Sequence, residues 1–319
     1  MGDPGGPLPG RAEGMRVGFG LPHTGQAASP EAIVRVAQQA EQLGYDSLWV
    51  YERFLFPVDP QVPYVGSADG AYPDVFKTVL DPIETLTYAA AHTRRVALGT
   101  SVLDMPYYNP VLLARRLTTL DVLSGGRLRV GLGLGWCKDE FDAAGRPMKN
   151  LGRFADEFIA VLKAIWTTDP AEFHGEFFTL PRSIIQPKPV QKPHPPIYLG
   201  AFSAGALKRA ATVSDGWNPV FLPIEVMRQM TEALKTMARE AGRDPDQVQV
   251  IVRANVHKTN EPLGDQRPAF SGSLDQIKAD IRATEELGAD EIFLDPTFSP
   301  AGQSLEGFLA TMEDFRGVV

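Results

Sequence analysis

The sequence is poor in cysteine and has no long apolar run, and each shortage excludes a class of protein. Its 319 residues contain one cysteine, Cys137, so an internal disulfide is excluded and a reducing, cytoplasmic location is expected. No apolar run approaches the ~20 residues that a membrane-spanning helix requires, so we expect a soluble protein with no membrane partner. The net charge of −8 argues against a nucleic-acid partner.

The first residues lack the features of a signal peptide. The stretch MGDPGGPLPGRAEG, residues 1–14, has no apolar segment, and we interpret it as a disordered tail. Residues 15–319 then form one domain, because α/β barrels commonly reach this length without dividing.

Two common kinds of catalytic centre lack their sequence signatures. The five histidines include neither H-x-H nor H-E-x-x-H, so no metal site is predicted. No G-x-S-x-G motif marks a nucleophilic serine. Cys137 beside Lys138 remains a candidate reactive thiol, and a carboxylate pair such as Glu52 and Asp104 leaves a glycosidase open.

What the sequence does contain is an alternation of strand-like and helix-like segments, eight of each, from Arg16 onward. We expect strands at residues 16–21, 47–52, 96–102, 128–135, 197–201, 216–220, 248–257 and 291–295. We expect helices near residues 30–43, 81–93, 110–123, 151–167, 203–213, 224–241, 273–287 and 303–315. Consecutive βα units in this number favour a single closed (β/α)8 barrel, or TIM barrel, over a doubly wound sheet.

Two insertions interrupt this rhythm. The first, residues 54–79, follows the second strand, and its prolines and aromatic residues predict a lid at the functional end of the barrel. The second, residues 169–196, precedes the fifth strand and contains a hairpin-like stretch at 173–178. An internal repeat between residues 41–50 and 285–294 predicts short structural turns at the opposite end.

The expected strand at residues 128–135 has one apolar face and one nearly bare face, where Gly131, Gly133 and Gly135 alternate with leucines. Two interpretations remain open: a ligand approaches this backbone closely, or the glycines fit a crowded barrel interior. The even spacing within a strand argues against a dinucleotide-binding fingerprint, which opens directly into a helix.

Polar residues at two other strand ends are candidates for a site. Arg253, Asn255 and His257 share one face of the seventh strand, and a buried arginine is costly unless it is paired. Arg253 therefore either pairs with Asp295 or Glu52 or faces a polar site. After the fifth strand, small residues lead into a helix that Ser203 can cap, and the free N–H groups there suit a phosphate.

Four segments together resemble the bacterial luciferase-like monooxygenase family. They are AEQLGYDSLWVYERF at 40–54, LTTLDVLSGGRLRVGLGLGWCKDEFDAAG at 117–145, EFHGEFFTLP at 172–181 and QPKPVQKPHPPIYLGAFSAGALKRAATVSDGWNP at 186–219. The resemblance covers nearly the whole chain after Met15 and implies a TIM-barrel oxidoreductase that uses a flavin or a deazaflavin. The segments most resemble the subgroup that depends on the deazaflavin coenzyme F420.

Carried over by position, the resemblance implies two groups of cofactor-binding residues. The ring would contact Thr100, Ser101, Val102, Leu134, Gly135 and Trp136. The phosphate loop would consist of Gly200, Ala201, Phe202, Ser203 and Ala204. The family's non-proline cis peptide corresponds to the Ser101–Val102 bond.

The chain departs from the family pattern after the second strand. Many members have Asp-His where this chain has Glu52-Arg53, and an arginine cannot serve as a general acid or base at neutral pH. We expect Arg53 to bind an anionic group while Glu52 holds Arg53 in place. Glu52, Arg53 and Trp136 are the candidate catalytic residues.

The sequence thus predicts an oxidoreductase that binds reduced F420 and transfers a hydride to or from a small organic substrate. FMN is the alternative cofactor, and it would imply a two-component monooxygenase that consumes O2 and receives FMNH2 from a separate reductase. A flavin-binding barrel without catalysis is an alternative from another class. A homodimer is also expected, because dimers are common in the family.

Overall fold

The computed structural model describes residues 14–67 and 69–318. The disordered tail expected at residues 1–14 falls, except for Gly14, outside the described residues. None of the helices within these ranges combines the length and apolarity needed to cross a membrane.

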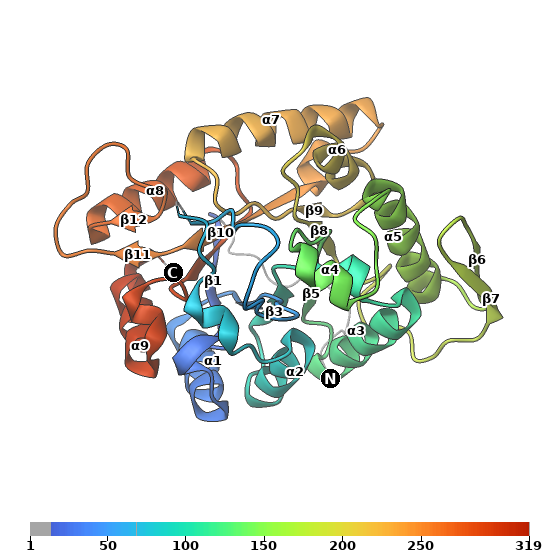
Figure 1. Ribbon diagram of the computed structural model, residues 1–319, viewed down its shortest axis with the longest axis horizontal. Coiled ribbons are helices and arrows are strands. Elements are labelled where there is room, and N and C mark those ends of the chain that lie inside the picture. Colours follow the sequence, from blue (N-terminus) through green and yellow to red (C-terminus); the bar gives the residue numbers. More distant parts are fainter. Residues whose placement is uncertain (1–13, 68, 319) are drawn as a thin grey trace.

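Eight parallel strands close into a barrel (Figure 1), which confirms the predicted architecture. They are β1 (Arg16–Gly20), β2 (Ser47–Val50), β3 (Ala97–Thr100), β5 (Leu128–Gly133), β8 (Ile197–Leu199), β9 (Gly216–Trp217), β10 (Gln249–Asn255) and β13 (Glu291–Asp295). The barrel closes where β3 pairs with β5, and the two-residue strand β4 (Leu103–Asp104) extends that pairing along β5.

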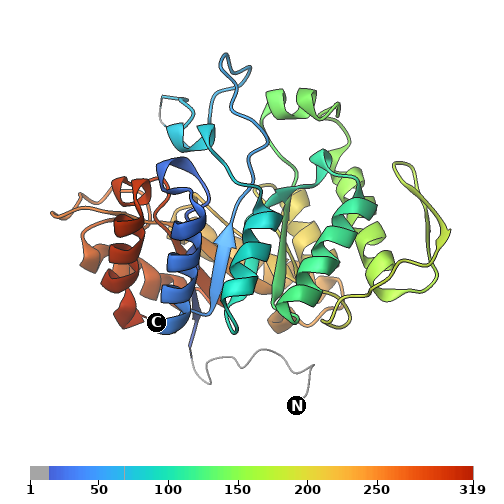
Figure 2. The same cartoon turned by 90° about the horizontal axis from the view of Figure 1, so that it is seen from below.

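The helices surround the barrel, with one between each pair of successive barrel strands and one after the last (Figure 2). They are α1 (Pro30–Leu43), α2 (Pro82–His92), α3 (Pro110–Ser124), α5 (Leu151–Thr167), α6 (Ala204–Val213), α7 (Ile224–Glu240), α8 (Leu274–Glu286) and α9 (Leu305–Asp314), all within two residues of the predicted bounds. The added elements are α4 (Lys138–Ala143), the hairpin β6 (Ala171–His174) with β7 (Thr179–Ser183), and the pair β11 (His257–Lys258) with β12 (Ser271–Gly272).

Local sequence signals explain where the helices begin and end. Ser29 caps α1 by accepting from the Ala32 N–H, and Pro30 fills the first helical position, where a missing N–H costs nothing. Gly44 then ends the helix in the left-handed region, with φ at 92°.

The turns at the amino-terminal end of the barrel share one kind of hydrogen bond, from a backbone N–H to an aspartate. Asp46, Asp215 and Asp290 each accept a backbone N–H from a neighbouring strand, at 2.8 Å, 2.7 Å and 2.8 Å. These carboxylates satisfy backbone N–H groups that the hydrogen bonds between strands leave unpaired. The turns predicted from the repeat are therefore structural, as expected.

The barrel interior is filled in layers. At the bottom, the buried carboxylate of Glu291 binds Arg129 and Arg16. Above it, Trp49 stacks on Phe293 with ring centroids 4.8 Å apart. The layer nearest the mouth is polar and begins with the ion pair between Arg253 and Asp295, at the end where TIM barrels place their active sites.

The bare face of β5 is explained by crowding. A Cβ atom at Gly131 would lie 1.9 Å from the Thr100 carbonyl oxygen, and one at Gly133 would lie 2.4 Å from a Val102 methyl group. The neighbouring strand therefore occupies the space, which favours the second of the two interpretations of these glycines.

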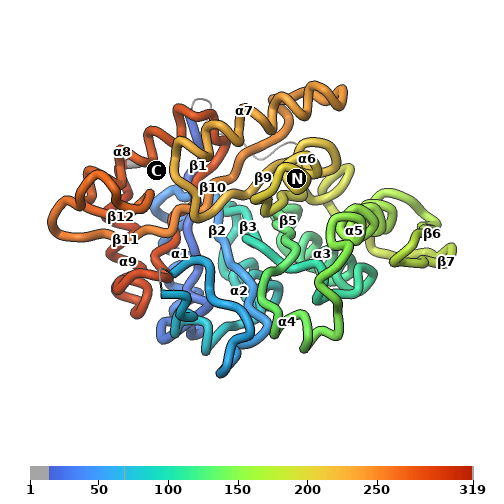
Figure 3. Tube along the Cα trace, turned by 45° about the horizontal axis from the view of Figure 1, so that its top comes forward, coloured from blue at the N-terminus to red at the C-terminus, as the bar shows by residue number. Residues whose placement is uncertain are grey.

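The functional end of the barrel carries two long additions. Residues 54–79, described except for position 68 and called the lid segment below, rise above the strand ends together with α4 (Figure 2). Residues 256–273 leave the barrel on the side opposite the β6–β7 hairpin, as Figures 1 and 3 both show.

Candidate active site

Arg53, just beyond β2, is the centre of a buried polar cluster at the barrel mouth. Its Nη2 lies 2.8 Å from Glu140 Oε2 and 3.6 Å from Asp104 Oδ2, and only 6% of its side chain is exposed. The guanidinium also lies over Trp136, 5.0 Å from the ring centroid. The expectation that Glu52 holds Arg53 was wrong: Glu140 does, because the Glu52 carboxylate is bound elsewhere.

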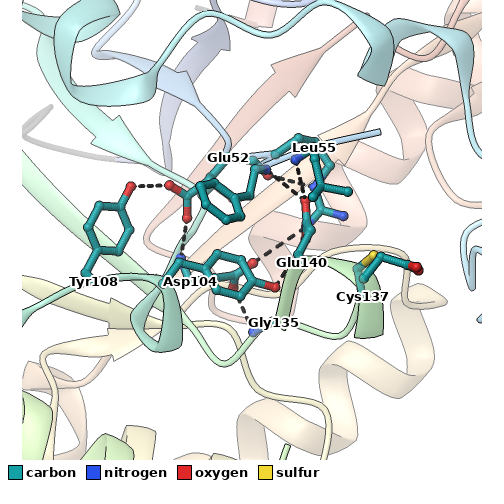
Figure 4. A network of polar contacts seen from close by, with 12 residues as sticks. Glu52, Leu55, Asp104, Tyr108, Gly135, Cys137 and Glu140 are labelled. Atoms are coloured by element: carbon teal, nitrogen blue, oxygen red, sulfur yellow. Dashed lines mark hydrogen bonds and ion pairs between the residues drawn. The ribbon is translucent and has the colours of Figure 1, made fainter. Parts of the chain in front are cut away.

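Glu140 joins this cluster to the lid segment (Figure 4). The second oxygen of its carboxylate accepts the backbone N–H groups of Phe54, at 2.8 Å, and Leu55, at 3.3 Å. Tyr107 donates its hydroxyl to the same carboxylate at 3.1 Å. Sequence reasoning missed this role, because Arg53, Phe54 and Leu55 lie more than 80 positions from Glu140.

Glu52 points the other way, toward Tyr108 and the backbone of Asp104 (Figure 4). It accepts the Tyr108 hydroxyl and, at 2.7 Å, the Asp104 N–H. Burial, reinforced by the nearby Asp104 charge, raises the pKa of Glu52 to about 8. The raised pKa favours the protonated form of Glu52 near neutral pH.

Asp104 lies between the two halves of the cluster. Its Oδ1 accepts the Gly135 N–H at 2.9 Å, which holds the turn where Gly135 adopts a φ of 70°. Burial raises the pKa of Asp104 to about 6, although the Arg53 charge opposes this shift.

Aromatic side chains of the lid segment close over the mouth. Tyr64 and Tyr72 pack against Trp136 with ring centroids 5.5 Å away, and Phe76 lies 6.0 Å from Tyr51 at the end of β2. Cys137 is buried beneath them, with its Sγ 3.4 Å from the Tyr72 hydroxyl. A thiol without solvent access is a poor nucleophile for an external substrate.

The first predicted ring-contacting segment lies at the end of β3. The Ser101–Val102 peptide is cis, as the resemblance implied. The Thr100 hydroxyl is used in bonds to the Gly131 backbone at 2.9 Å, so it belongs to the scaffold. Ser101 donates to Asn218 Oδ1 at 2.6 Å, and its carbonyl accepts from Arg253 Nη1 at 3.2 Å.

The other predicted segments converge beside it. Leu134 and Gly200 line one small hollow together with Arg209, and a Cβ at Gly200 would lie 3.7 Å from Val102. Ala201 is scaffold, since it is buried and its carbonyl accepts from Trp217 Nε1 at 3.0 Å.

The start of α6 is open to solvent. Ser203 caps the helix by accepting the Ala206 N–H at 3.3 Å, as predicted, and Phe202 is 62% exposed. Within the described residues, the N–H groups of Ala204 and Gly205 have no acceptor. Unpaired amides at a helix start offer both hydrogen bonds and a positive dipole end to an anion.

Arg253 is paired with Asp295 at 2.7 Å, the first of the two partners that the sequence left open. Its guanidinium also lies 4.4 Å from the Tyr51 ring centroid. Across residues 14–67 and 69–318, no three His, Cys, Asp or Glu side chains are arranged to hold a metal ion.

The sequence model of the family described as luciferase-like monooxygenase matches residues 15–262. The chain belongs to this family. An uncharacterised protein of Mycobacterium tuberculosis is 34% identical over 234 residues, which cover 72% of this chain and 80% of the relative.

Two relatives have named activities. The FMNH2-dependent dimethylsulfone monooxygenase of Pseudomonas putida is 35% identical over 162 residues, covering 50% of this chain and 44% of that protein. The F420-dependent glucose-6-phosphate dehydrogenase of Amycolatopsis mediterranei is 31% identical over 207 residues, covering 64% and 56%. The family thus contains flavin-dependent and F420-dependent oxidoreductases, and this chain is an enzyme of that class.

Solved structures agree on the fold. The monooxygenase RslO1 from Streptomyces bottropensis superposes with a TM-score of 0.78 at 23% identity, covering 95% of this chain and 98% of that one. An F420-dependent secondary alcohol dehydrogenase gives a TM-score of 0.75 at 19% identity, with 96% and 98% covered.

Proposed function

We propose that this chain is an F420-dependent oxidoreductase that transfers a hydride between the deazaflavin and a small organic substrate. The ring would lie against Ser101, Val102, Leu134, Gly135 and Trp136, with Thr100 supporting the first segment from behind. The phosphate would lie at the start of α6, against Gly200, Phe202, Ser203 and Ala204, with Ala201 fixing the loop.

The observation that carries the phosphate assignment is the open first turn of α6. The amides of Ala204 and Gly205 lack acceptors, and a Cβ at Gly205 would meet no atom within 4 Å. The residues therefore fit an anionic group without rearrangement.

The choice of F420 over FMN rests on the charges beside this helix start. A Cβ atom at Gly152 would lie 2.9 Å from Nη2 of Arg209. The Arg209 side chain therefore extends from α6 to the start of α5. Arg209 pairs with Asp156 at 2.5 Å, whereas Lys208, exposed on the same helix, forms no salt bridge among the described residues. Cations on this helix suit a cofactor with an anionic tail beyond its first phosphate, which F420 has and FMN lacks.

The bound deazaflavin would supply two-electron hydride chemistry, and the chain's own groups would position it and exclude water. In this proposal Trp136 forms one wall of the ring site, Arg53 fixes Trp136 and the lid segment, and Glu52 is a buried acid of raised pKa bound to Tyr108. Burial of the aromatic lid would keep solvent from the reacting atoms. A cytoplasmic location and a homodimer belong to the same proposal.

FMN is the alternative that a specific observation favours, because the Pseudomonas putida relative depends on FMNH2. That reading adds a separate reductase as a partner and consumption of O2. A barrel that binds flavin without catalysis would share the binding site and lack turnover.

Anaerobic titrations with F420, with its tail-less precursor and with reduced FMN test the proposal. We expect F420 to bind most tightly and the precursor, which lacks the phosphate and the tail, to bind more weakly. Micromolar affinity for reduced FMN with none for F420 would overturn the assignment and favour the monooxygenase.

A further inference from the structure

A cavity of about 520 Å³ opens at the carboxyl end of β10, between the lid segment and residues 256–273. This volume is typical of pockets for small ligands. The polar residues Arg253 and Asn255 line it together with the apolar residues Phe221, Met227, Phe270 and Phe298. Figure 3 shows residues 256–273 on the side away from α5 and α6, so the cavity lies across the barrel mouth from the proposed phosphate site.

Among residues 14–67 and 69–318, neither polar atom of the Asn255 side chain has a hydrogen-bond partner. Its Oδ1 and Nδ2 are both buried and unpaired, and so is the Nε of Arg253, a side chain that is only 7% exposed. Native proteins pair nearly all buried polar atoms, and an unpaired one carries a desolvation cost that a ligand would remove. Two residues that line this cavity therefore hold one acceptor and two donors without partners.

The charges around the cavity are already balanced. Arg253 pairs with Asp295, and Arg267 forms a two-point contact with Asp280 at 2.5 and 2.7 Å. Among the described lining residues there is no carboxylate, and His257 lies exposed at the rim. A ligand finds neither an uncompensated cation nor an anion here.

We propose that this cavity is the substrate pocket and that it takes an uncharged, largely apolar molecule carrying one oxygen function, an alcohol or a ketone. Arg253 Nε and Asn255 Nδ2 donate to the ligand oxygen, and Asn255 Oδ1 accepts from a hydroxyl. Arg253 also donates to the Ser101 carbonyl, which places the oxygen beside a predicted ring contact. That the ligand is a substrate rests on the proposed function, whereas the chemistry of the ligand is inferred from the cavity alone.

Binding to four molecules with the same naphthalene body tests the inference on the cofactor-free protein and again with saturating F420. They are 2-acetonaphthone, 1-(2-naphthyl)ethanol, 2-naphthoate and 2-ethylnaphthalene. Asn255→Leu removes the buried amide at nearly constant size, and Gln266→Leu makes the same change at the exposed rim of the cavity as the matched control. Fluorescence titration and a melting curve report binding and folding for each variant.

We expect Asn255→Leu to weaken binding of the ketone and the alcohol about tenfold relative to binding of 2-ethylnaphthalene. Gln266→Leu should leave this ratio of affinities unchanged. Tightest binding of naphthoate, or equal ratios in the two variants, would overturn the inference. Displacement of the ketone by F420 would also overturn it, because the cavity would then hold the cofactor. Probe binding that depends on Asn255 in a protein without affinity for F420 would support the pocket and refute only the proposed function.

Discussion

Arg53 and Glu140 form an ion pair 2.8 Å long that joins the end of β2 to α4. Both side chains are buried, and the same Glu140 carboxylate accepts two backbone N–H groups at the start of the lid segment. The pair therefore connects the barrel mouth to the start of the lid segment.

Replacing Glu140 by Gln should destabilise the protein by about 3 kcal/mol, because it leaves the Arg53 charge buried with a more distant partner. Chemical denaturation measures the change. Asp142→Asn is the matched control on the same helix, since that carboxylate is exposed and an asparagine oxygen can still accept from Gln61 at the surface. Equal effects of the two substitutions would contradict the role assigned to Glu140.

Arg53→Met should be more destabilising alone than in combination with Glu140→Gln. The single variant leaves the Glu140 charge buried without Arg53, and the double variant removes that charge as well. The difference between the single and double variants, measured as free energies of unfolding, gives the coupling. We also expect Arg53→Met to reduce turnover, since Trp136 loses the cation over its ring. Additive free energies would show that the two residues act independently.

The raised pKa of Glu52, about 8, makes stability depend on pH. Between the unfolded value of about 4.3 and the folded value, the folded protein keeps a proton that the unfolded chain has lost. The contribution of Glu52 is therefore complete below about pH 4 and is lost as pH rises through the folded pKa.

Glu52→Gln imitates the protonated carboxyl at every pH. The free energy of unfolding of this variant should fall less between about pH 5 and pH 9 than that of the parent, by an amount on the order of a few kcal/mol. Glu31→Gln, at an exposed site in the first turn of α1, is the control. Parallel pH profiles for the parent and Glu52→Gln would show that Glu52 is not the titrating group.

Ser203→Asp should weaken cofactor binding at least tenfold while preserving the fold. Aspartate is a good helix cap, so α6 remains intact, but its charge repels a phosphate at the same helix start. Ser304→Asp makes the same substitution at the cap of α9 and should leave the affinity unchanged. If titration gives one affinity for both variants, the phosphate binds elsewhere.

Cofactor should protect the lid segment from proteolysis, because its aromatic side chains pack on Trp136, a predicted ring contact. Limited proteolysis with and without saturating cofactor measures this, with cleavage sites located by mass spectrometry. The β6–β7 hairpin, an exposed excursion far from the mouth, provides the internal reference. A lid cleaved at the same rate in both samples would remove it from the cofactor site.

The sequence predicted the barrel well because its signals are local. Ser29 and Gly44 mark the ends of α1, and Asp46 and Asp290 mark equivalent turns. Seven of the eight barrel strands nevertheless end one to three residues earlier than predicted, because the apolar pattern continues past the ladder into the mouth.

The candidate site was predicted less completely, because its contacts join distant segments. Ser203 was found from its capping position, whereas α4 was missed and Glu140 with it, since six residues of helix leave a short periodic signal. The unpaired state of Asn255 is likewise invisible in sequence, because only the packed structure shows which polar atoms lack partners.

The hydrogen bonds of Glu140 to Phe54 and Leu55 hold the lid segment and α4 together as one unit. Gln61 strengthens this union by donating to Asp139 at 3.0 Å. If the mouth opens, these two parts would move together, and contacts such as that between Phe76 and Phe298, whose ring centroids are 5.7 Å apart, would break. A cross-link between the lid segment and α4 would leave the mouth free to open. A cross-link between positions 76 and 298 would hold it closed.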